Sequence, residues 1–188
     1  MRVIAGKYRS RPLQSISGMD VRPTSDRLRE TLFNVLSAAH GGTVEGTVWV
    51  DLFAGTGAVG IEALSRGANH VHFVESSKKA ARVVRENLRS LGIDHGFEVI
   101  EREAVQGLRL LESQGVRCDV CFLDPPYRMA GAYEQTLGLL SQSQLIGPKS
   151  VVIAEHDKHF DPGEQFDSLR RFRKLQQGDA SLSFYRKG

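Results

Sequence analysis

From residue 48 onward, short apolar segments alternate regularly with segments whose apolar residues recur at helical spacing. This alternation limits the possible folds more than any other feature, because strands joined through helices by short connections form a parallel, doubly wound sheet. The apolar segments predict strands at 48–53, 71–74, 97–100, 118–123 and 151–155. The intervening segments predict helices at 60–66, 78–91, 105–114 and 131–142. We therefore expect an α/β fold with helices on both faces of one sheet.

The two ends of the chain depart from this alternation. Residues 28–36 carry one apolar stripe at helical spacing, and Thr24 or Ser25 can cap the start of that helix. Near the C-terminus, the pattern at 169–175 and 180–185 predicts a hairpin at the edge of the sheet.

Length and composition agree with one globular domain. The chain has 188 residues, of which 40% are hydrophobic and 25% charged, and this suits a single core. We interpret residues 1–188 as one domain, with a basic extension at 1–20 and a catalytic core at 21–188. The chain start lacks the apolar core of a signal peptide, and no apolar run of about 18 residues could cross a membrane. We therefore expect a cytoplasmic protein.

A glycine-rich loop lies between the first predicted strand and its helix. Residues 55–60 match G-x-G-x-x-G, a pattern that allows a tight turn and brings the ligand close to the backbone and to a helix N-terminus. Glu75 follows at the end of the second strand, where a carboxylate can accept hydrogen bonds from both hydroxyls of an adenosine ribose. These features suit NAD and S-adenosylmethionine about equally.

Asp51, directly before the loop, favours S-adenosylmethionine. A carboxylate there would repel a pyrophosphate, but it could accept hydrogen bonds from the amino group of a methionine moiety. Phe53 and Ala54 make the mouth of the loop apolar, which suits a ligand without phosphate.

The sequence Asp-Pro-Pro-Tyr, at residues 124–127, follows the fourth predicted strand. In a doubly wound sheet this strand neighbours the first, so the motif should face the same crevice as the glycine loop. The Asp124 carboxylate and the Pro125 carbonyl could accept the two N–H bonds of a base amine and align its lone pair with a sulfonium methyl. Two prolines stiffen this backbone, and Tyr127 offers a face for a flipped-out base. The motif therefore predicts a methyltransferase that acts on an exocyclic base nitrogen.

Several motifs together resemble the bacterial ribosomal RNA small-subunit methyltransferase D family, which methylates N2 of guanine 966 in 16S rRNA. They are RVIAGKYRSRP from residue 2, RPTSDRLRETLFNVL from residue 22, DLFAGTGAVGIEALSRGA from residue 51, DPPY from residue 124 and GDASLSFYR from residue 178. The resemblance implies a Rossmann-like class I methyltransferase fold, with a seven-stranded, mostly parallel sheet and an N-terminal β-hairpin. It also implies a substrate in 16S rRNA, presented on an assembling small ribosomal subunit.

The resemblance and the motifs together give three sets of candidate residues. The catalytic candidates are Asp124, Pro125, Pro126 and Tyr127. The cofactor-binding candidates are Asp51, Phe53, Ala54, Gly55, Thr56, Gly57, Glu75, Ser76, Glu103 and Ala104. Glu103 stands where such enzymes often have an Asp that contacts the adenine. The RNA-binding candidates are Arg9, Arg11, Arg22, Arg27 and Arg29.

The arginine candidates belong to a strongly basic N-terminal segment. The net charge of the chain is +3, whereas residues 1–29 carry seven cations and two carboxylates. Such a segment attracts phosphates without sequence choice. Arg27 is also a candidate partner for the carboxylate of S-adenosylmethionine, and ordinary surface arginines are the alternative reading.

Other functions remain open from the residues alone. The methyl acceptor could instead be adenine N6 in DNA or a glutamine side chain of a protein, although 188 residues leave little room for a DNA-recognition domain. An NAD-dependent oxidoreductase would leave Asp51 and Asp-Pro-Pro-Tyr unexplained, and so would an RNA-binding module without catalysis. Cys118 and Cys121 lack a second C-x-x-C or a close histidine pair, so we expect no metal. We expect a monomer.

Overall fold

The computed structural model describes residues 1–16, 25–39, 44–126 and 129–188. The helices in these ranges are α1 (Asp26–Ala39), α2 (Ala58–Ser65), α3 (Lys78–Ser90), α4 (Ala104–Ser113) and α5 (Ala130–Gln142). The strands are β1 (Val48–Leu52), β2 (His70–Val74), β3 (Phe97–Ile100), β4 (Cys118–Leu123), β5 (Ile146–Asp157), β6 (Gln165–Phe166), β7 (Leu169–Gln177) and β8 (Ala180–Lys187). All eight strands form one sheet in the order β3-β2-β1-β4-β5-β8-β7-β6.

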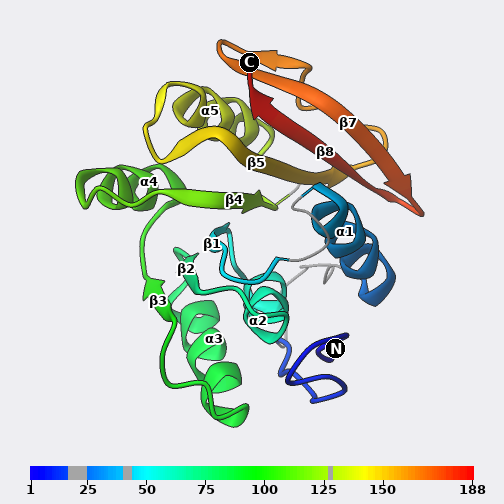
Figure 1. The fold of residues 1–188 in the computed structure, drawn as a ribbon, viewed down its shortest axis with the longest axis vertical. Coiled ribbons are helices and arrows are strands. Elements are labelled where there is room, and N and C mark those ends of the chain that lie inside the picture. Colours follow the sequence, from blue (N-terminus) through cyan, green and yellow to red (C-terminus); the bar gives the residue numbers. More distant parts are fainter. Residues whose placement is uncertain (17–24, 40–43, 127–128) are drawn as a thin grey trace.

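The sheet has helices on both faces, as the alternation predicts (Figure 1). One buried cluster joins α1, α2 and α3 to the sheet, and a second joins α4 and α5 to the opposite face. β1 to β5 are parallel, and β8 and β7 are antiparallel to their neighbours. The predicted class I methyltransferase sheet is thus confirmed, but the predicted number of seven strands is wrong. The two-residue strand β6 pairs with β7 and makes the eighth, and so short a segment has no detectable periodicity.

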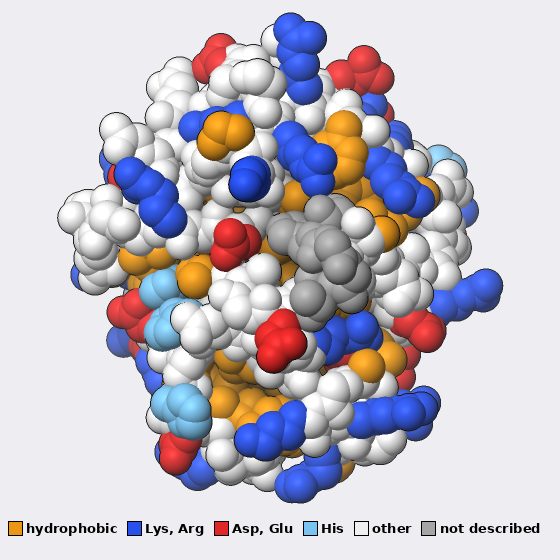
Figure 2. All heavy atoms as spheres, in the orientation of Figure 1, with side chains coloured by type: hydrophobic (Ala, Val, Ile, Leu, Met, Phe, Trp, Pro, Cys, Tyr) orange, Lys and Arg blue, Asp and Glu red, His pale blue; other side chains and the backbone are white. Residues whose placement is uncertain are grey.

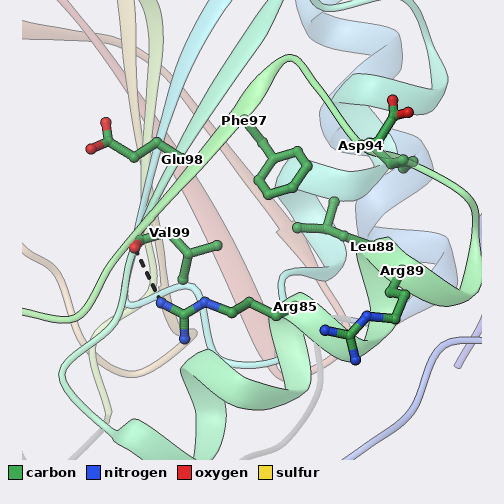
Figure 3. A pocket seen from close by; sticks show the side chains of 8 residues that line it. Arg85, Leu88, Arg89, Asp94, Phe97, Glu98 and Val99 are labelled. Carbon is green, nitrogen blue, oxygen red and sulfur yellow. Dashed lines mark hydrogen bonds between the residues drawn. The ribbon is translucent and has the colours of Figure 1, made fainter.

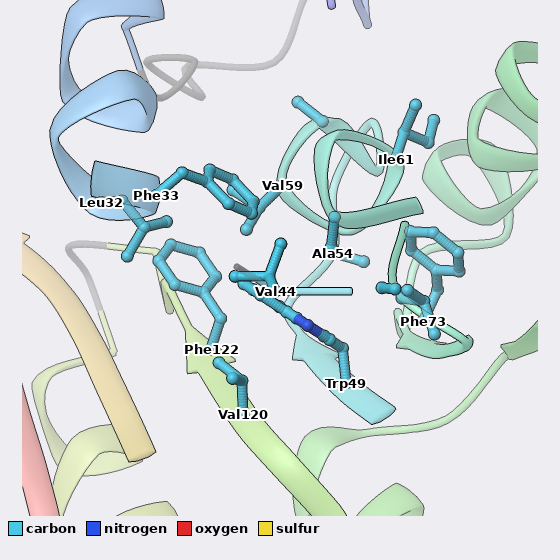
Figure 4. Close-up of a cluster of buried hydrophobic side chains, with 14 of the residues drawn as sticks. Leu32, Phe33, Val44, Trp49, Ala54, Val59, Ile61, Phe73, Val120 and Phe122 are labelled. Carbon is cyan, nitrogen blue, oxygen red and sulfur yellow. The ribbon is translucent and has the colours of Figure 1, made fainter. Parts of the chain in front are cut away.

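The first cluster holds α1 against the middle of the sheet (Figure 4). Trp49 of β1 stacks on Phe33 of α1, with ring centroids 5.3 Å apart, and both side chains are fully buried. The indole N–H of Trp49 donates to the Thr47 hydroxyl over 2.8 Å, so its one polar atom is satisfied inside the core.

The start of α1 confirms the predicted cap. The Ser25 hydroxyl accepts a hydrogen bond from the backbone N–H of Leu28 over 3.1 Å, as an N-cap side chain does. Thr24, the other candidate, lies outside the described residues. Further along α1, the Thr31 hydroxyl donates to the Gln177 side chain at the end of β7, which ties the helix to the C-terminal hairpin.

The predicted N-terminal β-hairpin is present in a short form. Within 1–16, the antiparallel bridge between Arg2 and Pro12 is flanked by backbone hydrogen bonds from Val3 N–H to the Arg11 carbonyl and from Leu13 N–H to the Met1 carbonyl, each over 3.0 Å. The backbone N–H groups of Ile4 and Ala5 donate to the buried Glu62 carboxylate of α2, at 2.7 and 3.0 Å. The Glu62 carboxylate thus anchors on α2 the backbone that follows the first strand of the hairpin.

Gly6 allows this N-terminal segment to approach α2 closely. It has a φ of +81°, and a Cβ atom at this position would lie 1.9 Å from the Ser65 carbonyl oxygen. The Lys7 N–H donates to the same carbonyl over 2.7 Å. The segment therefore packs directly on the helix that follows the glycine loop.

Candidate active site

The carboxyl ends of β1 and β4 form the centre of the candidate site. These two strands are direct neighbours, with Asp51 paired to Phe122 and Leu52 paired to Leu123. Asp124 therefore follows the last paired residue of β4, while Phe53 begins the glycine loop after β1. The structure thus brings the two motifs to the same edge of the sheet, as the sequence predicts.

The glycine loop turns sharply between β1 and α2. Phe53 and Gly57 have φ angles of 59° and 78°, and a Cβ atom on Gly57 would lie 3.1 Å from Val84 of α3. Gly60 has a different role, because a Cβ atom there would lie 2.3 Å from the Phe73 ring of β2. The last glycine of the motif thus permits α2 to pack against the sheet, and the earlier one allows the turn itself.

Glu75 holds the glycine loop in place. Its carboxylate, at the end of β2, accepts hydrogen bonds from the backbone N–H groups of Gly55 and Ser77, each over 2.8 Å. A carboxylate has about four acceptor positions, so these two bonds leave capacity for the hydroxyls of a ribose. Ser76, between the two partners, is exposed.

Asp51 lies beneath the loop, at the N-terminal end of α2. Its carboxyl accepts a hydrogen bond from the Gly60 N–H over 3.0 Å, and the residue is 2% exposed. Burial raises the pKa of Asp51 to about 8, the Gly60 N–H counteracts part of this rise, and the charge of Glu75 adds to it. A cationic ligand group near this carboxyl would favour its ionised form.

Asp124 has a second carboxylate as its neighbour. Leu123 of β4 pairs with Ala154 of β5, so Asp124 lies beside Glu155 at the ends of these strands. Burial raises the pKa of Asp124 well above its usual range, and the nearby charges of Glu155 and Asp51 raise it further. These three acidic residues follow one face of the sheet, the face that α1 to α3 cover.

Sequence reasoning missed Glu155. The residue is 5% exposed, and its backbone carbonyl accepts a hydrogen bond from the Tyr133 hydroxyl of α5 over 2.7 Å. The sequence did contain a signal. Glu155 ends an apolar segment that is predicted to be a strand, Asp124 directly follows another, and two such carboxylates can meet at one edge of a sheet. The neighbouring His156 points elsewhere, because its Nε2 atom is 2.9 Å from the Ser183 hydroxyl of β8.

The two prolines after Asp124 differ in exposure. Pro125 is buried, whereas Pro126 is exposed and its carbonyl accepts a hydrogen bond from the Met129 N–H over 2.8 Å. This bond turns the chain toward the start of α5. Tyr127 lies outside the described residues, so its stacking role stays a prediction.

The remaining cofactor-binding candidates lie around the same edge. Ala54 is buried and its N–H donates to the Val74 carbonyl over 3.1 Å, whereas Thr56 is half-buried. Glu103 is exposed at the start of α4, and Ala104 behind it is buried. Glu103 thus lies three residues after the end of β3, and solvent or a ligand can reach its side chain.

Asn87 connects the glycine loop to the N-terminal segment. This fully buried side chain of α3 donates to the Thr56 carbonyl over 3.0 Å. It also donates to the Gln14 carbonyl and accepts from the Gln14 N–H, at 3.3 and 2.7 Å. One amide therefore joins three parts of the chain that lie far apart in sequence.

The arginine candidates divide into exposed and buried residues. Arg9, Arg11 and Arg27 are exposed, and Arg22 lies outside the described residues. Arg29 does not agree with the expectation of an RNA contact, because its side chain is 0% exposed. It donates to Asp26 over 2.6 Å and to the Arg2 carbonyl over 2.9 Å, since the N-terminal segment folds over it.

A hollow of about 430 Å³ lies apart from this edge, between α3 and β3 (Figure 3). Leu88 and Phe97 form its apolar floor, while Arg85 and Glu98 lie at its rim. None of its lining residues belongs to the glycine loop or to Asp-Pro-Pro. Cys118 and Cys121 are buried, free thiols, and the described residues contain no group of three histidine, cysteine or acidic side chains that could hold a metal ion.

Known protein sequences match this chain over most of its length. The family described as "Conserved hypothetical protein 95" matches residues 1–186. The ribosomal RNA small subunit methyltransferase D of Haemophilus influenzae is 36% identical over 84% of this chain and 79% of its own. The Escherichia coli protein of the same name is 32% identical over 84% and 75%. The chain belongs to the ribosomal RNA small-subunit methyltransferase D family. The predicted resemblance is thereby confirmed.

Solved structures share the fold of this chain. A hypothetical protein of Thermus thermophilus has a TM-score of 0.82 and 29% identity, and the match covers 98% of both chains. A 16S rRNA N2 G1207 methyltransferase of T. thermophilus, solved with AdoMet and guanosine, has a TM-score of 0.70. That match covers 92% of this chain and 45% of the other at 19% identity, so it shows the fold alone. No helix among the described residues has the length and apolar character to cross a membrane.

Proposed function

We propose that this chain transfers a methyl group from S-adenosylmethionine to the exocyclic N2 of a guanine in 16S rRNA, guanine 966. The observation that carries this proposal is the position of Asp124 and Pro125 at the end of β4, directly beside the glycine loop after β1. A cofactor held by the loop and a base held by Asp-Pro-Pro-Tyr would meet at this edge.

The cofactor would occupy the loop side of the edge. Glu75 fits the ribose hydroxyls, because its carboxylate already faces the loop and has acceptor capacity beyond Gly55 and Ser77. Asp51 fits the ammonium of the methionine moiety, since a buried acidic group gains from a cationic partner. Glu103, exposed beyond β3, would reach the adenine.

The base would occupy the Asp124 side. A base amine is a poor nucleophile, because its lone pair is delocalised into the ring. The Asp124 carboxyl and the Pro125 carbonyl would accept its two N–H bonds and orient the lone pair toward the methyl group. S-adenosylmethionine, when bound, would supply a methyl group on a sulfonium, and the sulfur would keep the electrons of the broken S–C bond as a thioether when the base nitrogen forms its N–C bond. The methylated nitrogen then loses one proton.

Asp124 is suited to receive that proton. Its buried position and the neighbouring Glu155 raise the pKa of its carboxyl far above that of an exposed aspartate. A carboxylate with a raised pKa is a stronger base, so the ionised Asp124 could take a proton from the cationic amine. Tyr127 would stack on the flipped base.

Relatives and charge support a ribosomal RNA substrate. The names of the H. influenzae and E. coli relatives state methylation of small-subunit ribosomal RNA. The exposed Arg9, Arg11 and Arg27 would contact RNA phosphates on the N-terminal side of the site, and Arg22 belongs to the same segment. We propose that a monomer acts in the cytoplasm on an assembling small subunit.

Transfer of labelled methyl groups tests this function. Incubation with labelled S-adenosylmethionine and small subunits from a methylation-deficient strain should yield N2-methylguanosine in 16S rRNA. Asp124→Asn should abolish transfer and retain cofactor binding, while Glu134→Gln on the exposed side of α5 is a matched control that retains both. Label in DNA, in protein or in another nucleoside would contradict the proposal.

A further inference from the structure

A second cationic surface lies on the C-terminal hairpin, far from the basic N-terminal segment. Residues 169–187 contain six cations and one carboxylate. Lys and Arg side chains gather over the region that β7 and β8 occupy, with hydrophobic side chains between them (Figures 1 and 2). We call one part of this surface the hairpin patch, which consists of Arg170, Phe172, Arg173 and Arg186.

The hairpin patch lies on one face of the sheet. Arg170 pairs with Arg186 and Arg173 pairs with Phe184, and residues that are directly opposite in antiparallel strands share a face. Phe184 packs in the cluster under α1, so this is the same face that Asp124 and Glu155 follow. A register shift between Arg171 and Arg173 lets Phe172 contact Phe184 from this face, with ring centroids 6.2 Å apart.

The cations of the hairpin patch differ from those on the opposite face. There, Arg171 and Lys174 form ion pairs with Asp161 at 2.6 and 2.8 Å, so their charges are compensated. In the described part of the chain no ion pair involves Arg170 or Arg173, and both are exposed. The hairpin patch therefore presents uncompensated positive charge to an anionic partner.

Phe172 adds an exposed aromatic ring to these charges. It is 46% exposed, and the Arg186 guanidinium lies 4.6 Å from its ring centroid. Aromatic rings combined with cations are typical of surfaces that bind single-stranded nucleic acid, where bases stack and phosphates pair.

We propose that the hairpin patch binds a single-stranded RNA segment of the same substrate, with Phe172 stacking on an unpaired base and Arg170 and Arg173 contacting its phosphates. This rests on the proposed function, because the substrate must be RNA. Glu155 of β5 pairs with Leu182 of β8, and Leu182 pairs with Leu175 of β7. Two strand spacings thus separate Glu155 from Leu175, about 10 Å, and the patch begins at Arg173, two residues or about 7 Å further along β7. An RNA strand of a few nucleotides with one base in the site can therefore reach the patch.

The N-terminal segment and the hairpin patch lie on opposite sides of the catalytic edge. The segment packs on α2, next to β1 and β2, whereas the hairpin lies beyond β5 (Figure 1). RNA that contacts both surfaces would therefore cross the edge between them. The two surfaces would hold the segments on either side of the target nucleotide.

Binding to an in vitro transcript of 16S rRNA, over a range of salt concentrations, tests the hairpin patch. Arg170→Ala with Arg173→Ala should weaken binding roughly 25-fold at 0.1 M salt, because two phosphate contacts contribute about 1.4 to the slope of log affinity against log salt. Arg109→Ala with Lys149→Ala removes two exposed cations elsewhere and should have little effect. Phe172→Leu should weaken binding roughly tenfold, while Phe172→Trp should retain it.

Two further measurements separate this inference from the proposed function. Affinity for S-adenosylmethionine should be unchanged in every variant, which also shows that the variants fold. Equal RNA affinity in wild type, patch variants and control overturns the hairpin patch, and so does a loss confined to ribosomal proteins or anionic vesicles. A wild-type protein that transfers no label to RNA contradicts the proposed function instead.

Discussion

The Asn87 side chain donates a hydrogen bond to the Thr56 carbonyl over 3.0 Å and thereby fixes the glycine loop from α3. Because the same amide holds Gln14 through two further bonds, the N-terminal segment and the loop share one buried anchor. RNA bound to the N-terminal segment and a cofactor bound to the loop would therefore both affect the position of the Asn87 side chain.

Asn87→Leu should weaken cofactor binding as well as stability. It removes three hydrogen bonds: the exposed Gln14 can bind water instead, whereas the half-buried Thr56 carbonyl loses its partner at a cost of roughly 1 to 3 kcal/mol. We expect the Kd for S-adenosylmethionine, measured by calorimetry, to rise at least fivefold. Ser90→Ala is the control on the same helix, since the Ser90 hydroxyl donates to the Asn87 backbone carbonyl alone. Reduced stability with an unchanged Kd would refute the link to the loop.

Asp51→Asn should stabilise the cofactor-free protein in a pH-dependent way. The pKa of Asp51 is raised from its usual value near 4 to about 8 by burial. Between these values the folded state keeps a proton that the unfolded state has lost, so wild-type stability falls as pH rises. The free energy of unfolding of the Asn variant should exceed that of wild type by a few kcal/mol at pH 8, and the difference should vanish near pH 4.

The same variant should bind the cofactor less tightly, because an amide cannot supply the negative charge that an ammonium seeks. Urea unfolding at several pH values gives the stability, and calorimetry with S-adenosylmethionine gives the affinity. A difference in stability that does not change with pH would contradict the assigned burial of Asp51.

Glu155→Gln should move the pH dependence of methyl transfer. The charge of Glu155 raises the pKa of Asp124, so its removal should lower that pKa. If transfer needs ionised Asp124, the acidic limb of kcat against pH should move to lower pH, while affinity for S-adenosylmethionine stays near that of wild type. Single-turnover rates between pH 5 and 9 measure this shift. An unchanged limb, with Glu134→Gln as control, would remove Glu155 from the chemistry.

Phe33→Ala should destabilise the whole domain. The residue is fully buried and stacks on Trp49, so truncation leaves a cavity between α1 and the sheet. We expect a loss of roughly 3 to 5 kcal/mol in the free energy of unfolding. Phe33→Leu retains most of the volume and should cost clearly less. Equal losses for both variants would show that the stacked ring, and not the cavity, dominates.

Local patterns were sufficient to predict that β1 and β4 are neighbours and that the two motifs of the candidate site lie at one edge. The apolar segments and the alternation of strands and helices placed β1 beside β4, and thus Asp124 beside the glycine loop. The Ser25 cap was also predictable, because an N-cap bond involves residues only three positions apart. Such features depend on neighbours in sequence or on rules of chain connection.

Contacts between distant segments account for the errors. Arg29 looked like a surface residue because its burial depends on Arg2, which folds over it from 27 positions away. The contact of the N-terminal hairpin with Glu62 was not predicted, because no local pattern connects that residue to Ile4. Glu155 gained its importance from the register of β4 and β5, which includes an irregularity that no sequence rule locates.

The position of β8 in the sheet has a consequence for folding during synthesis. It is the last strand in chain order, yet it lies between β5 and β7 inside the sheet. A nascent chain that lacks residues 180–187 would therefore leave β5, with Glu155 at its end, as an open edge that attracts other strands. The edge that carries the candidate site would be among the last regions to be covered by a neighbouring strand during synthesis, and a chain without β8 would be prone to aggregate through β5.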